Sequence, residues 1–174
     1  MPANPLTQAL AAGDPQAYAA LYDRLGGRMF RVAMLLLRDR QEAEDAVQDV
    51  FVSLVRSRHR LLGVDDLEAY VFSIVRHMAA RRGLRRTAEQ KTIRALAENP
   101  PVEPGSDGSE ADADALALAV GALPQEQREV IALKVDAGLT FAQIAQVLEI
   151  SANTAASRYR YAVERLRRTL EGDS

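Results

Sequence analysis

The sequence predicts an all-α protein made of two small helical domains joined by an acidic, flexible linker. Apolar residues recur at helical spacing along most of the chain, whereas residues 99–109 contain three prolines and two glycines and no such spacing. With 174 residues, 48% of them hydrophobic and 26% charged, the chain can bury one moderate core or two small ones. We therefore place the first domain at 1–90, the linker at 91–113 and the second domain at 114–174.

The first domain begins with two predicted helices. Asp14 can cap a helix that has Pro15 at its first position, and apolar residues follow at helical spacing. Gly26-Gly27 is expected to end this helix, because glycine is the usual residue after a helix C-terminus. A second helix is then expected over residues 29–37.

Two further helices complete the predicted first domain. The third, over about 40–54, places alanine, valine, phenylalanine and leucine on one side and leaves an acidic outer face. Asp65 with Glu68 forms a capping box for the fourth, which continues into a basic run. All four predicted helices are amphipathic.

The second domain contains two short helices joined by a tight turn. Thr140 with Gln143 forms a capping box for the first helix, and Ser151 can cap the second. Residues 151–170 hold five arginines against one acid, Glu164, and such an excess favours phosphate binding. This is the layout of a DNA-reading helix-turn-helix, although two capped helices with a short loop also occur in many other helical domains.

The net charge of −2 conceals two oppositely charged segments. Residues 69–94 carry seven basic side chains against one acid, Glu89, and residues 99–114 carry five acids and no base. A polyanion such as nucleic acid would bind the first segment readily and the second only weakly.

Several classes of protein are disfavoured by composition. The chain has no cysteine and two histidines, His59 and His77, so neither a disulfide nor a metal site is expected. No nucleophile–base pair or phosphate-cradling glycine loop is evident, so we expect no catalytic residue and no cofactor. No apolar run reaches the roughly 18 residues of a membrane helix, and the start does not read as a signal peptide, so a cytoplasmic protein is expected.

Two motifs resemble those of a known family. Glu42–Phe51, followed by Tyr70–Arg76, resembles the region-two domain of bacterial sigma factors. The helix-turn-helix, preceded by Leu123-Pro124 and followed by Tyr161–Arg167, looks like their region-four domain. With these two domains in this order, the chain is similar to the compact extracytoplasmic-function (ECF) group.

The resemblance implies partners and sites. It implies docking on core RNA polymerase, at the clamp helices and the flap, and recognition of promoter DNA, with the polymerase supplying the catalysis. The implied polymerase-binding residues are Asp45, Gln48 and Asp49. The implied contacts to the −10 element are Arg60, Tyr70, Arg76, His77, Arg81 and Arg85, and those to the −35 element are Ser151, Thr154, Ser157, Arg158, Arg160 and Tyr161.

The chain departs from the family pattern at five of these or neighbouring positions. Family members usually have tryptophan at Tyr70, asparagine at His77 and often aspartate at Arg81, so base preference at the −10 element is open. We interpret Tyr70 as a core anchor and His77 as a half-buried polar residue. Ala156 replaces a common basic residue and Glu149 the usual turn glycine, which shifts the expected −35 contacts toward Ser157, Arg158, Arg160 and Tyr161.

Two other functions fit the residues. A helix-turn-helix regulator would bind palindromic DNA without polymerase, and a basic-helix interaction module would bind an acidic partner or RNA regardless of promoter sequence. The chain also leaves open whether a separate anti-sigma protein or its own synthesis controls it.

Overall fold

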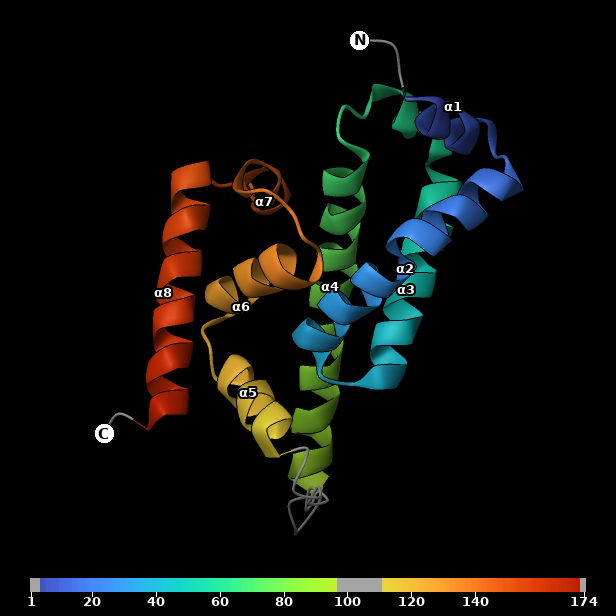
Figure 1. Ribbon diagram of the computed structural model, residues 1–174. Coiled ribbons are helices and arrows are strands. Elements are labelled where there is room, and N and C mark those ends of the chain that lie inside the picture. The colour runs from blue at the N-terminus through green and yellow to red at the C-terminus, as the bar shows by residue number, and fades with distance from the viewer. Residues whose placement is uncertain (1–3, 97–110, 173–174) are drawn as a thin grey trace.

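The computed structural model describes residues 4–96 and 111–172, and all regular elements in these ranges are helices (Figure 1). The all-α class is confirmed. Residues 97–110, most of the expected linker, lie outside the described residues. The N-terminal half consists of α1 (Pro5–Ala12), α2 (Pro15–Leu37), α3 (Arg40–Arg56), the 3-10 helix η1 (Arg58–Gly63) and α4 (Leu67–Leu96). The C-terminal half consists of α5 (Ala111–Gly121), α6 (Gln125–Ile131), the π-helical turn η2 (Ala132–Asp136), α7 (Phe141–Leu148) and α8 (Ala152–Glu171).

Helix α2 corrects the predicted break at Gly26-Gly27. It begins at the expected Asp14 cap, whose side chain accepts a hydrogen bond from the Gln16 amide, and it continues without interruption to Leu37. Gly26 is buried, and a Cβ atom there would lie 3.2 Å from the ring of Tyr22. The glycine therefore serves close packing within a helix, because tertiary contacts outweigh its weak helix propensity.

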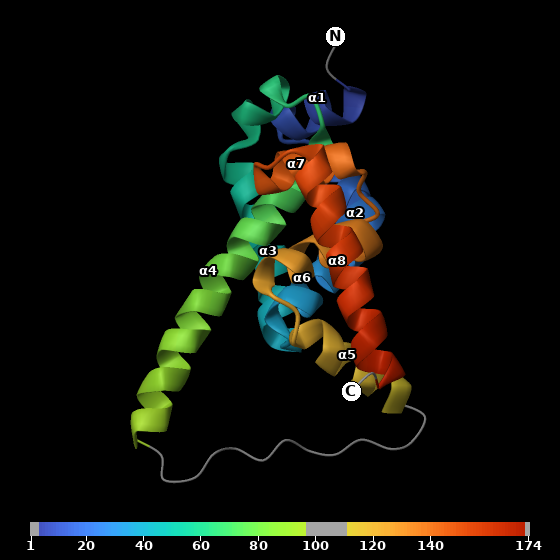
Figure 2. The same ribbon diagram turned by 90° about the vertical axis from the view of Figure 1, so that its left-hand side faces the viewer.

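Helix α4 is longer than the basic run suggested, and it begins at a different cap. Asp66 accepts a hydrogen bond from the Ala69 amide, so Asp66 is the capping residue in place of Asp65. The helix has 30 residues, about 45 Å, and extends to Leu96, into the range expected for the linker. Figure 2 shows its C-terminal part projecting beyond the other helices, and residues 87–93 are exposed.

The helix-turn-helix forms as predicted. Thr140 and Gln143 make both bonds of the capping box, and Ser151 accepts a hydrogen bond from the Thr154 amide. Ile144, Val147 and Leu148 of α7 and Ala155 of α8 are buried between them. Alanine at the contact allows the two helices to approach closely.

The turn between α7 and α8 stores backbone strain. Glu149 adopts φ 56°, the left-handed conformation that glycine adopts at no steric cost. We expect Glu149→Gly to raise the free energy of unfolding by about 0.5–1 kcal/mol, measured by urea denaturation. Glu149→Ala is the matched control, because it removes the side chain and keeps the strain. Equal stability of the two variants would contradict the assignment.

One hydrophobic core extends across both halves of the chain. It joins Leu21, Met29 and Phe72 of the N-terminal half to Leu133 and Leu139 of the C-terminal half, all with little or no exposure. Helix α7 packs on α4, and η2 packs on α2. The two sets of helices expected as separate domains therefore share an apolar interface in this structure.

Candidate functional site

The expected polymerase-binding residues lie on the outer face of α3. Gln48 is exposed, and the side chains of Asp45 and Asp49 are 38% and 46% exposed. Both carboxylates face Arg82 of α4, which lies 2.5 Å from an oxygen of Asp49 and 3.8 Å from one of Asp45. The acidic face is thus accessible to solvent and held from behind by a basic side chain.

An apolar groove of about 840 Å³ lies beside this acidic face, between α2 and α3. Tyr22 and Val52, which are 57% and 46% exposed, line it together with Phe51 and Gln48. The rings of Tyr22 and Phe51 lie 5.6 Å apart. Helical spacing alone gave no sign that Tyr22 is exposed. The glycine four residues after this aromatic was the available sign that the ring lies across its own helix.

The basic face of α4 presents His77, Arg81 and Arg85, which recur every four residues and are all exposed. The expectation that His77 is half-buried is therefore wrong. Arg76 belongs to a different face: it is half-buried and its Nε lies 3.1 Å from the carboxylate of Glu129 in α6. The structure thus groups three of the four basic residues expected on this helix and holds the fourth in an ion pair.

Arg60 meets this basic face at a cavity of about 410 Å³ between α3, η1 and α4. Arg56, His59 and Arg81 also line it, and Met78 contributes an apolar wall. Tyr70 lies elsewhere, half-buried against the core, in agreement with its interpretation as an anchor. Sequence reasoning missed Arg56, at the end of α3, and His59 of η1, because only the packing of these two elements against α4 brings them together.

The expected −35 contacts occupy the start of α8. Ser151, Thr154, Arg160 and Tyr161 are exposed, whereas Ser157 and Arg158 are half-buried. Arg158 lies 3.3 Å from Glu126 of α6, and the Arg160 guanidinium lies over the Tyr161 ring at 5.2 Å. The more outward position of Arg160 agrees with helical periodicity.

Polar contacts tie the two halves together around their shared core. The Nε atom of Arg28 donates to the carbonyl of Ala137 at 2.9 Å, and its Nη2 atom lies 3.0 Å from Glu68. Gln143 of α7 donates to Asp66, the cap of α4, at 3.0 Å. Helix α7 therefore lies beside the loop that precedes α4.

Burial raises the pKa of Asp136 in η2, and the positive charge of Arg31 in α2 opposes this shift.

Family models match both halves of the chain. The model described as Sigma-70 region 2 matches residues 21–90, and the one described as Sigma-70, region 4 matches residues 113–166. The ECF RNA polymerase sigma factor SigK of Mycolicibacterium vanbaalenii is 29% identical over 174 residues, covering 95% of this chain and 87% of its own. SigK of Mycobacterium tuberculosis is 29% identical over 181 residues, covering 95% and 92%.

This chain is an ECF sigma factor. It therefore belongs to the proteins that direct core RNA polymerase to promoters and start transcription there.

Solved structures agree with this fold. CnrH in complex with the cytosolic domain of CnrY has a TM-score of 0.72, 24% identity and 97% coverage of each chain. The sigma factor RpoE of Bartonella quintana in complex with the anti-sigma factor NepR has a TM-score of 0.68 and 25% identity, covering 89% of this chain and 99% of its own.

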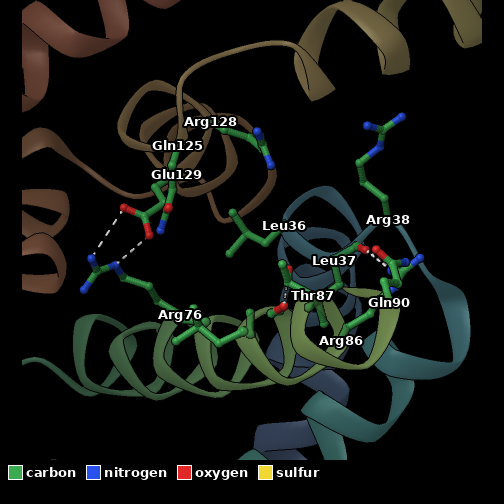
Figure 3. Close-up of a pocket in the computed structure, with 14 residues that line it drawn as sticks. Leu36, Leu37, Arg38, Arg76, Arg86, Thr87, Gln90, Gln125, Arg128 and Glu129 are labelled. Carbon is green, nitrogen blue, oxygen red and sulfur yellow. Dashed lines mark hydrogen bonds and ion pairs between the residues drawn. The ribbon is translucent and has the colours of Figure 1, made fainter. Parts of the chain in front are cut away.

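This sigma factor also has a basic cleft of about 630 Å³ between α4, α6 and the end of α2 (Figure 3). Its charged lining residues are Arg38, Arg76, Arg86, Arg128 and Glu129. Arg128 donates to the carbonyls of Gly121 and Leu123, and Arg86 donates to that of Leu37 at 2.7 Å.

None of the helices in the described parts of the chain combines the length and the apolar character that a membrane span requires.

Proposed function

We propose that this sigma factor docks on core RNA polymerase through α3 and holds the −10 and −35 elements through α4 and α8. The N-terminal domain of this proposal comprises residues 1–90 and the C-terminal domain residues 114–174. Asp45 and Asp49 supply charge for a basic partner, Gln48 adds an exposed amide that can form hydrogen bonds, and the groove at Tyr22 and Val52 supplies an apolar anchor beside them.

The observation that carries the −10 assignment is the exposed stripe of His77, Arg81 and Arg85. It leads to the cavity at Arg60, which is lined by three arginines and His59, by the apolar side chains of Val52 and Met78, and by one carboxylate, that of Asp49. Phosphates of a single strand can follow such a stripe, and an unpaired base can enter such a cavity because its flat face accepts apolar and cationic contacts. The chain selects the promoter and holds the separated strand, while the polymerase forms the bonds.

The packed arrangement described above must open at a promoter. The two promoter elements lie roughly 25 base pairs apart, about 85 Å along the axis of B-DNA. Helix α4, the longest in the part of the chain that the structure describes, spans about 45 Å, and α7 packs against it. We therefore propose that the halves separate when the chain binds polymerase, with Arg76 exchanging Glu129 for DNA phosphate.

A separate anti-sigma protein is a proposed further partner. CnrH and RpoE were solved with proteins bound to them, and RpoE's partner is an anti-sigma factor. The cleft between α4 and α6, lined by four arginines and one glutamate, suits an acidic segment of such a protein. The proposed setting is the cytoplasm, where the polymerase and the promoter are found.

Transcription in vitro with bacterial core RNA polymerase tests the proposed function. We expect the full chain to direct promoter-dependent initiation and to give a promoter gel shift only in the presence of core polymerase. A tight shift by the chain alone on palindromic DNA would instead support a direct DNA-binding regulator. Binding that is independent of promoter sequence would support an interaction module.

The stripe on α4 predicts a change in salt dependence. Arg81→Ala with Arg85→Ala should slow formation of the open complex, with a defect that narrows as salt increases. Each phosphate contact to a single strand contributes about 0.7 to the slope of the logarithm of the binding constant against the logarithm of salt concentration. The slope of the double variant should therefore be shallower by about 1.4. Permanganate reactivity of −10 thymines over a salt series measures this. The control is Lys91→Ala, because Lys91 is also exposed on α4. A salt slope of the double variant equal to that of the wild type would exclude Arg81 and Arg85 as contacts to the −10 strand.

The start of α8 predicts two different effects at the −35 element. Arg160→Ala should relax preference at one or two positions by about 1–3 kcal/mol, the cost of a lost base contact. Arg158→Ala should weaken binding to all −35 sequences alike, because this side chain is anchored near Glu126 and suits contact with a phosphate. Transcription from a −35 library distinguishes them, with Arg167→Ala as the control. The reversed pattern would refute this pairing of roles.

A further inference from the structure

Arg82 lies at the centre of three carboxylates on α3. Its Nη1 atom is 2.9 Å from Glu42 and 3.8 Å from Asp45, and its Nη2 atom is 2.5 Å from Asp49. The three acids follow one another at spacings of three and four residues, which places them on one stripe of the helix. A single planar guanidinium therefore bridges two turns of α3.

The arginine is buried, while the acids remain open to a partner. The side chain of Arg82 is 14% exposed, and those of Glu42, Asp45 and Asp49 are 34%, 38% and 46% exposed. Burial opposes a raised pKa at Arg82, but hydrogen bonds from the guanidinium to Asp49 and Glu42 raise that pKa above its usual value. The guanidinium stays charged, and the stripe keeps a net negative charge toward solvent.

This ion cluster is a poor device for stability alone. The Nε atom of Arg82 is buried and makes no hydrogen bond. A buried ion pair pays a desolvation cost that an apolar side chain of similar size avoids. The benefit of the arrangement lies in its geometry, because carboxylates held in place lose little conformational freedom when a partner binds them.

We propose that Arg82 is a positioning residue that orders Glu42, Asp45 and Asp49 into one rigid docking stripe for a basic helix of core RNA polymerase. The inference rests on the proposed docking role of α3 and adds Glu42 to it. Arg82 acts from the buried side: it lies against one oxygen of each docking carboxylate, and Gln41 donates to the other oxygen of Asp45.

The test is titration of core RNA polymerase with labelled full-length variants, at several salt concentrations and with dissociation rates. Arg82→Met should weaken binding by about tenfold or more through faster dissociation, because the stripe is no longer preorganised. Its salt dependence should steepen, since the stripe gains net negative charge. Arg82→Lys should recover part of the affinity, because lysine keeps the charge but lacks the planar fork. Glu42→Gln should weaken binding less than Arg82→Met.

Arg86→Met is the matched control. Arg86 is also a half-buried arginine of α4; it donates to the carbonyl of Leu37 and lies 4.0 Å from Asp39, the cap of α3, but it pairs with none of the three stripe carboxylates. We expect it to match Arg82→Met in thermal stability and the wild type in affinity. Equal losses of affinity in both variants, or wild-type or tighter binding by Arg82→Met, would overturn the proposal. Reversing Asp45 and Asp49 in the same assay tests the docking role itself, so the two failures are distinguishable.

Discussion

Replacing Asp45 and Asp49 by arginine is expected to abolish binding to core RNA polymerase. Charge reversal converts attraction into repulsion at a contact that loses its water, and like charges there cost several kcal/mol. A loss of about 3 kcal/mol corresponds to more than a hundredfold in affinity. Pull-down at increasing concentrations of core polymerase measures the loss. Full binding by the folded double variant would remove α3 from the docking site.

The structure supplies a control for this experiment that the sequence alone does not suggest. In the double variant, Arg82 would face two new arginines, and repulsion inside the protein could weaken binding indirectly. Adding Arg82→Glu and Glu42→Gln restores internal pairs of reversed polarity, without setting a new carboxylate against that of Glu42, while the outer surface stays basic. We expect this quadruple variant to regain thermal stability without regaining polymerase binding. Recovery of binding together with stability would show that the loss was structural.

Holding the two halves together is expected to abolish promoter-dependent transcription. Asp66 and Gln143 are in hydrogen-bond contact at 3.0 Å, and the chain has no cysteine. Cysteines at these two positions can therefore be joined selectively by a short, reducible thiol cross-linker. The linked protein cannot span the roughly 85 Å between the two promoter elements, so initiation should fall to background.

Reduction of the cross-linker is the internal control. It should restore transcription to the level of the double variant that was never linked. This comparison also controls for the loss of the cap that Asp66 provides to α4, because both samples lack it. Single-cysteine variants treated with the same reagent should stay active. A linked protein that initiates as well as the reduced one would contradict the proposed separation of the halves.

Local features of the sequence predicted the helix-turn-helix well. Its caps at Thr140 and Ser151 involve groups three residues apart, so the chain encodes them without help from the rest of the fold. The sigma-factor motifs also lie within single helices, and the family follows from them. Short elements such as α1 and α6, which span eight and seven residues, were missed because so few turns give little periodic signal.

The sequence by itself determined the helical class, the caps, the family and the residues with the right chemistry for polymerase and promoter. Tertiary structure alone decided which of those side chains are available. Gly26 continues a helix because it is buried in the packed core face of α2, and Arg76 is paired with a glutamate 53 residues away while Arg81 is exposed. Arg82 and Arg81 are adjacent in sequence, yet one is buried among carboxylates and the other faces solvent. The physical reason is that local bonds follow from neighbouring residues, whereas burial and charge pairing depend on how distant helices pack.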